Sequence, residues 1–272
     1  MDARLIGPRL KVRRALRGLQ ELGAQMTAFT DTKPYEILVY DDLNTRERIY
    51  QVRIYQEPPS ELGVVVGEIA HNLRSALDHM ARLLPIAPGK VRPERPTFPI
   101  FTLHDPDPTD TKRKYFSRNH QLQWVSPEAF AVVEGLQPYH STDEPSGDPL
   151  AVLHDLWNWD KHNAIHIVAA SLRPPRIEGQ IVTEGVTFAP EGPVYDGQIL
   201  GRVPLDGFQV VNDNPEPMNL SFTIEPAFGG GGPASGKLLF PTLAGLCNYV
   251  GMKVMGPLER VITEAGRHDD AP

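Results

Sequence analysis

Apolar residues recur at three- and four-residue intervals in several stretches of the chain, which is the spacing of an amphipathic helix. A proline followed by spaced leucines marks residues 8–26, and a capping serine followed by an apolar stripe marks residues 60–85. The spacing returns over residues 127–171, where "QPYHSTDEPSG" separates a first helix from a second that begins at about residue 148, and over residues 242–265. The pattern predicts helices in these four parts.

A period of two residues dominates other parts of the chain. Residues 36–55 carry β-branched and aromatic residues on both sides of an Asp-Asp-Leu-Asn-Thr turn, which predicts a hairpin. Residues 177–228 contain short alternating runs separated by Gly, Asn and Pro, which predicts an antiparallel meander. Residues 86–122 are rich in proline and charge and are expected to form a surface loop. We therefore predict one α+β domain over residues 1–272, with a helical bundle packed against a small antiparallel sheet that includes the hairpin and the meander.

Composition narrows the class of protein. A chain of 272 residues that is 40% hydrophobic can bury a substantial core. The single cysteine, Cys247, excludes an internal disulfide, and the chain has no apolar run long enough to cross a membrane. We therefore expect a cytoplasmic protein with no membrane partner.

Charge limits any contact with nucleic acid. The net charge of −7 argues against a general nucleic-acid coat, because phosphate backbones are held mainly by Lys and Arg. The first twenty residues carry six Lys or Arg against one Asp, so they hold +5 and leave −12 for the rest. An RNA contact must be local, and the chain contains no DNA-binding motif. No nucleotide cofactor is expected, since "GGPASGKL" has Leu238 where a phosphate loop needs Ser or Thr.

The second predicted helix, "GEIAHNLRSALDHMARLL", contains unusual polar residues. Arg74 and His79 are separated by four residues, a spacing used by one class of metal-independent ribonucleases, although the same spacing also arises by chance. At 100° per residue, Asn72 and His79 lie on one flank of the apolar face and Arg74 lies on the opposite side. Arg74 is also four residues before Asp78, which permits an ordinary ion pair. Such a pair leaves Asn72 and His79 unexplained.

The segment "LWNWDKHNAIHIV" adds a second anomaly. Helical periodicity places Asp160 on the buried face, where an isolated charge costs several kcal/mol and needs a partner. Arg74 and His79 are the natural candidates. His162 and His166 are four apart, which would suit two zinc ligands, but no third ligand is evident nearby. No metal is therefore expected there.

Four blocks of the chain resemble a known family. "GEIAHNLRSALDHMARLL", "TFPIF", "LQPYH" and "LWNWDKHNAIHIV" look like the blocks of a large family of uncharacterised bacterial proteins, and the match spans residues 67–168. That family carries no known activity, and Asn163 stands where its pattern usually has arginine. Within this frame, the Arg74-x4-His79 element is similar to the signature of HEPN proteins, helical bundles that often act as endoribonucleases in toxin and defence systems. HEPN enzymes favour Asn, Asp or His after the arginine, whereas this chain has Ser75.

The HEPN resemblance implies a metal-independent endoribonuclease. His79 would act as general base or acid at the RNA 2′-hydroxyl and leaving oxygen, and Arg74 would hold the scissile phosphate. Asn72 would orient His79 or the ribose, and Asp160 would set the tautomer of the histidine or the position of the cation. HEPN sites usually meet across a dimer, so the resemblance also implies a homodimer with RNA as its partner.

Two alternatives remain open. In the first, the protein is a non-catalytic binding or structural protein whose polar residues, Asn72, Arg74, Asp78, His79 and Asp160, form a buried network that fixes the packing of two helices. In the second, it is a metal-dependent hydrolase that uses histidines. A ribonuclease requires both Arg74 and His79 exposed in a basic groove, whereas a structural network leaves them buried.

Overall fold

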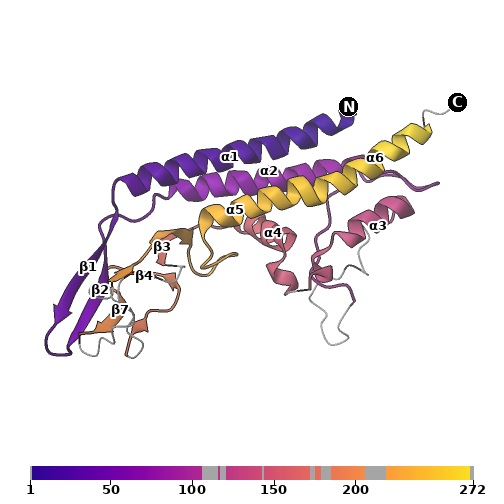
Figure 1. The fold of residues 1–272 in the computed structure, drawn as a ribbon. Helices are drawn as coiled ribbons and strands as arrows, with labels where there is room; N and C mark the ends of the chain where they lie inside the picture. The colour runs from indigo at the N-terminus through magenta and orange to yellow at the C-terminus, as the bar shows by residue number, and fades with distance from the viewer. Residues whose placement is uncertain are drawn as a thin grey trace. The chain divides into compact units, whose positions relative to one another are not determined.

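The chain has an α+β fold, as the sequence predicts (Figure 1). The structure is a computed structural model that describes residues 2–105, 116, 121–142, 144–171, 175–178, 185–205 and 219–269. Contacts between Cα atoms group the chain into two compact units. The helical unit comprises Met1–Leu22, Val64–Ala164 and Phe240–Pro272, and the sheet unit comprises Gly23–Gly63 and Ile165–Leu239. One domain over residues 1–272 stays a prediction.

The helices lie close to where the apolar periodicity predicts them. They are α1 (Ile6–Asp31), α2 (Glu61–Leu83), α3 (Pro127–Gly135), α4 (Pro149–Asp160), α5 (Leu239–Asn248) and α6 (Met255–Asp269). A π-helical segment, Tyr249–Val254, joins α5 to α6. Short 3-10 turns occupy Ala3–Leu5, Pro138–His140 and Pro145–Gly147.

Side chains at their first turns fix where α3 and α4 begin. The Ser126 hydroxyl accepts a hydrogen bond from the Ala129 N–H at 3.3 Å, and the Asp148 carboxylate accepts one from the Leu150 N–H at 2.8 Å. Both are N-caps that satisfy an amide with no partner inside its own helix, and each is followed by a proline that is suited to the first helical position.

The predicted helix from residue 148 to residue 171 is too long. Helix α4 ends at Asp160, and residues Ile167–Ser171 form strand β3, which pairs with strand β9. Its two β-branched residues, Ile167 and Val168, favour an extended backbone. Pairing of Ile167 with Phe228 and of Val168 with Ala227 then replaces the helical hydrogen bonds. A period of three or four residues did not distinguish these two outcomes over so short a run.

Helix α1 packs along α2 and α6 within the helical unit, where Figure 1 shows the three running side by side. At Gly18, a Cβ atom would lie only 2.9 Å from Ile69 of α2, so glycine permits the close approach. Arg9 of α1 binds the Glu259 carboxylate of α6 at 2.8 and 2.6 Å. This bidentate pair joins residues 250 positions apart in the sequence.

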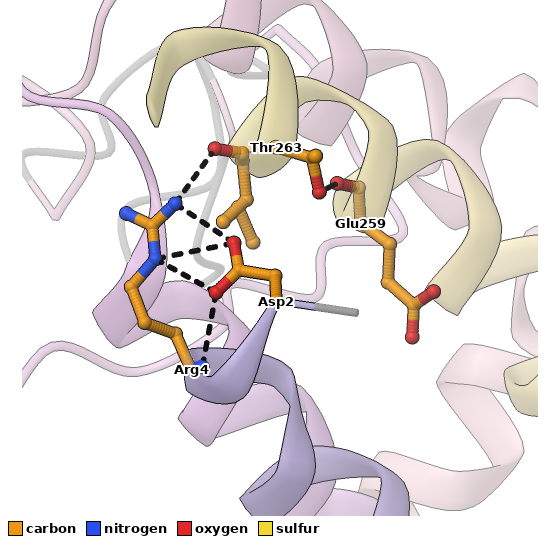
Figure 2. A network of polar contacts seen from close by, with 5 residues as sticks. Asp2, Arg4, Glu259 and Thr263 are labelled. Atoms are coloured by element: carbon orange, nitrogen blue, oxygen red, sulfur yellow. Dashed lines mark hydrogen bonds and ion pairs between the residues drawn. The ribbon is translucent and has the colours of Figure 1, made fainter. Parts of the chain in front are cut away.

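Figure 2 shows a second polar contact between the N-terminus and α6. The Asp2 carboxylate accepts hydrogen bonds from the Arg4 backbone at 3.0 Å and from the Arg4 guanidinium at 2.8 Å. The same guanidinium donates to the Ile262 carbonyl at 3.4 Å, and the Thr263 hydroxyl donates to the Glu259 carbonyl at 2.8 Å. Because Arg4 is half exposed, we expect only a modest contribution to stability from its ion pair.

The sheet unit is antiparallel throughout the described strands. They are β1 (Tyr35–Asp42), β2 (Glu47–Ile54), β3 (Ile167–Ser171), β4 (Arg176–Glu178), β5 (Thr187–Phe188), β6 (Gly192–Pro193), β7 (Ile199–Pro204), β8 (Asn219–Ser221) and β9 (Glu225–Phe228). The hairpin predicted over residues 36–55 is confirmed as β1 and β2, and it joins β7 and β5 in one sheet of order β1-β2-β7-β5.

The predicted single sheet is wrong in one respect. Strands β6, β3 and β9 form a second sheet, and β4 pairs with β8 in a third. Residues 179–184 and 206–218 of the predicted meander lie outside the described residues. Buried apolar side chains from the first two sheets pack together, among them Val52, Ala169 and Leu200. A separate cluster forms around Tyr50, whose hydroxyl accepts a hydrogen bond from the Leu220 N–H at 3.2 Å.

The segment predicted as a surface loop over residues 86–122 is partly buried. Phe98 is 1% exposed, and Phe116 and Leu122 are also buried. An isolated bridge connects Ile86 to Val125. Residues 106–115 and 117–120 lie outside the described residues. In its described residues the segment has no α-helix and no named strand, as its proline-rich composition predicts, but composition did not predict the burial, because burial depends on what the segment packs against.

Candidate functional site

A polar stripe runs along α2 inside the helical unit. Gly67, His71, Arg74 and Asp78 follow one another at steps of four, three and four residues, so they share one face of the helix. The last turn of α4 lies against this stripe. A Cβ atom at position 67 would be 2.3 Å from Asp160 Oδ1, so the missing side chain of Gly67 lets the carboxylate approach the helix backbone.

Arg74 is the buried centre of the stripe, with 4% of its surface exposed. Its Nη2 atom lies 3.0 Å from Asp78 Oδ1 and donates to the Phe98 carbonyl at 2.6 Å. Its guanidinium carbon lies 5.2 Å from the ring centroid of Trp157 on α4. Nε and Nη1 are buried and have no hydrogen-bond acceptor among the described residues, and the cation–π contact with Trp157 offsets part of the cost of burying the guanidinium charge.

Asp78 completes a clamp on the backbone of residue 98. Its Oδ1 accepts a hydrogen bond from the Phe98 N–H at 2.9 Å, while Arg74 binds the Phe98 carbonyl. One ion pair therefore satisfies both main-chain groups of a buried residue. Burial raises the pKa of Asp78, and the charge of Arg74 opposes that shift. Burial also lowers the pKa of Arg74, although a guanidinium stays charged in proteins.

Gln137 holds the same segment from its other side. Its Nε2 donates to the Pro99 carbonyl at 3.1 Å and to the Val133 carbonyl at 2.9 Å, and its Oε1 accepts from the Phe101 N–H at 3.0 Å. The side chain is 2% exposed, so these bonds have little competition from water. The segment 98–101 is thus bonded to α2 at one end and to Gln137 at the other.

The outer end of the stripe carries exposed charges. Lys161 follows α4 directly, and its Nζ lies 2.9 Å from the ring centroid of Trp157. Partial burial lowers the pKa of Lys161, and the charge of Arg74 lowers it further. Two cations therefore share one indole, with Asp78 as the nearby carboxylate that opposes the shift.

The structure separates the two residues of the HEPN-like spacing. Arg74 is buried against Trp157, whereas His79 is exposed and its Nδ1 would lie 3.5 Å from a Cβ at Gly7 of α1. Five residues along a helix correspond to a rotation of about 140° between them. Asn72 is half-buried and donates its Nδ2 hydrogen bond to the Glu68 carbonyl at 2.8 Å. The predicted ion pair between Arg74 and Asp78 is present.

The prediction that Asp160 is buried is wrong. It is exposed at the end of α4, where it lies against Gly67. Partial burial raises the pKa of its carboxyl, and the nearby His71 lowers it. Arg74 and His79, its expected partners, are not among the groups that shift it. The helix ends at this residue, so its side chain lies at the rim instead of inside the packed face.

Sequence reasoning missed the part that His71, Phe98, Gln137, Trp157 and Lys161 play in this arrangement. The four resembling blocks were the available signal: three of them meet along the segment 98–101, and the fourth supplies Trp157 and Lys161. The motif that drew attention, the spacing of Arg74 and His79, concerns two residues on different sides of one helix.

The described residues contain no group of three His, Cys, Asp or Glu side chains arranged to hold a metal ion. His162 and His166 follow the end of α4, so they do not have the helical spacing that two zinc ligands would share. None of the described helices combines the length and apolar character that crossing a membrane requires. No protein-family model, curated protein or solved structure matches the chain.

Proposed function

We propose that this chain is a non-catalytic binding protein, in which Arg74 and Asp78 form a structural clamp for the segment 98–101. The observation that carries the proposal is that this one ion pair binds both main-chain groups of Phe98. A charged pair used in this way organises the packing of the helical unit. It leaves partner binding to surfaces elsewhere on the chain.

The burial of Arg74 argues against a role at a scissile phosphate. A cation that stabilises developing charge must face the substrate, and Arg74 is 4% exposed beneath Trp157 and Phe98. Exposing it would break a buried pair, and separating such a pair costs about 3–5 kcal/mol. The endoribonuclease, the RNA contact and the homodimer stay predictions from the HEPN resemblance. The metal-dependent hydrolase also stays a prediction.

A ribonuclease assay tests the proposal. Purified full-length protein is incubated with fluorescently labelled single-stranded RNA in EDTA, in parallel with the His79→Ala variant. A His71→Ala variant serves as the matched control, because it removes a histidine from another face of the same helix. We expect no cleavage by any of the three proteins. Cleavage by the wild type to a 2′,3′-cyclic phosphate, abolished by His79→Ala alone while its thermal melt is unchanged, would overturn the proposal in favour of the ribonuclease.

A further inference from the structure

Strand β1 leaves one of its edges without a neighbour in the described part of the chain. The first sheet has the order β1-β2-β7-β5, so among the described strands β1 lies at the edge and pairs only with β2. That pairing is antiparallel and regular over eight residues, from Tyr35 opposite Ile54 to Asp42 opposite Glu47. An edge of this length presents a row of main-chain donors and acceptors to an incoming strand.

One hydrogen bond fixes which main-chain groups face outward. The Tyr55 N–H donates to the Pro34 carbonyl at 2.8 Å, so the pair formed by residues 34 and 55 is hydrogen-bonded. Hydrogen-bonded and non-hydrogen-bonded pairs alternate along an antiparallel ladder. The amides of Leu38 and Tyr40 therefore point toward β2, and those of Ile37, Val39 and Asp41 point away from it.

The middle of this edge is apolar and exposed. Leu38, Val39 and Tyr40 are 36%, 49% and 45% exposed. Natural edge strands are usually protected by Lys, Pro or a bulge, and β1 has no Lys or Pro and pairs with β2 without a register shift. These features make β1 suited to pairing with an added strand.

Acidic residues flank the apolar middle at both ends. Glu36 accepts a hydrogen bond from the Tyr55 hydroxyl, and Asp41 pairs with Arg48 at 2.8 Å. Asp42 follows at the end of the strand, where it binds the Asn44 N–H at 2.9 Å. Glu36 is exposed and the side chain of Asp41 is 39% exposed, whereas Asp42 is half-buried, so the carboxylates of Glu36 and Asp41 can attract a cation at each end of the apolar middle.

We propose that the outer edge of β1 binds an extended segment of a partner protein by strand addition, and that this segment has an apolar centre flanked by Lys or Arg. Main-chain bonds to Ile37, Val39 and Asp41 supply affinity, and the acidic ends select basic flanks. A second copy fits less well. In the register that pairs all three outward amides, a two-fold axis through Val39 would place Glu36 opposite Asp42 twice.

This inference goes beyond the proposed function and does not depend on it, because β1 belongs to the sheet unit and the Arg74 clamp to the helical unit. Its failure would leave the clamp untouched. A positive ribonuclease assay would likewise say nothing about β1.

Peptide binding to the full-length protein tests the inference. The probe is a fluorescein-labelled peptide, Lys-Lys-Val-Thr-Val-Thr-Lys-Lys, and its affinity is read by fluorescence anisotropy. Val39→Pro removes an outward amide without removing a bond to β2, and proline is tolerated on edge strands. We expect it to weaken binding about tenfold or more, because one main-chain hydrogen bond is lost and the ring obstructs the edge. Val39→Ala keeps the amide and is expected to bind within about threefold of the wild type.

Hydrogen exchange on the wild type gives a readout that needs no variant. The peptide should slow exchange at the amides of Ile37, Val39 and Asp41 and leave that of Leu38, already bonded to β2, unchanged. Equal binding of a peptide with Glu in place of every Lys would overturn the charge selection. Wild-type affinity in a folded Val39→Pro protein, or a wild-type dimer that this variant alone dissociates, would overturn strand addition by a partner.

Discussion

Removing the carboxylate of Asp78 should destabilise the protein more than removing any exposed acid. Asp78→Ala leaves the guanidinium of Arg74 buried with its only ionic partner among the described residues gone. It also removes the acceptor of the Phe98 N–H, which is bonded at 2.9 Å. Both losses occur where water has little access, since the side chains of Arg74 and Asp78 are 5% and 25% exposed.

The size of the effect follows from these burial values. Breaking a buried ion pair by removing one partner costs about 3–5 kcal/mol, and an unsatisfied buried amide costs about 1–3 kcal/mol. The two costs overlap, and Asp78 is partly hydrated, so we expect a loss of about 3 kcal/mol in the free energy of unfolding. Asp78→Asn should lose less, because its amide oxygen can still accept from Phe98.

Urea unfolding at pH 7, followed by circular dichroism, measures this loss. Glu68→Ala is the matched control: it removes an acid from the same helix, and the pair between Glu68 and Arg14 at 3.2 Å is about half exposed on both sides. We expect this control to lose less than about 1 kcal/mol. The double variant Arg74→Met with Asp78→Ala should recover part of the loss, because no buried charge remains. A loss at Asp78 no larger than that at Glu68 would refute the clamp.

Three further predictions concern other parts of the chain. Gly63→Ala should lower the free energy of unfolding by about 2 kcal/mol, because the new Cβ would lie 2.3 Å from the Ile165 carbonyl oxygen. This cost should exceed the gain from the better helix propensity of alanine. A denaturant midpoint at or above the wild-type value would contradict the prediction. The Tyr139 hydroxyl donates a hydrogen bond to the Glu134 carboxylate and lowers its pKa. This bond therefore stabilises the folded protein at pH values above the unfolded pKa of about 4.5, and the stabilisation is lost as pH falls through the lowered pKa of the folded state. Glu134→Gln should therefore be less stable than the wild type at pH 7, and this difference in stability should shrink at pH 3, as urea titrations at both pH values would show. Burial raises the pKa of the Cys247 thiol to about 11. At pH 8 a thiol reagent should therefore label the native protein much more slowly than the unfolded protein. Equal labelling rates would contradict this and would mean that the thiol is accessible.

The sequence by itself determined the elements whose signals are local. The apolar stripe of α2 is continuous over its length and the hairpin has a turn between two β-rich runs, so residues 60–85 and 36–55 were predicted with nearly correct limits. The ion pair of Arg74 and Asp78 was also predictable, because residues four apart on one helix are neighbours whatever surrounds them. Each of these features depends on residues that are close together in the sequence.

Only the tertiary structure decided what covers each face. Periodicity placed Arg74 and His79 on different sides of α2, but burial of one and exposure of the other depend on Trp157 and Phe98, which are distant in sequence. The end of α4 and the start of β3 were decided by pairing with β9, since residues 161–171 suit either structure locally. A hydrophobic pattern predicts which side of a helix or strand is buried, but it does not predict which other segment packs against that side.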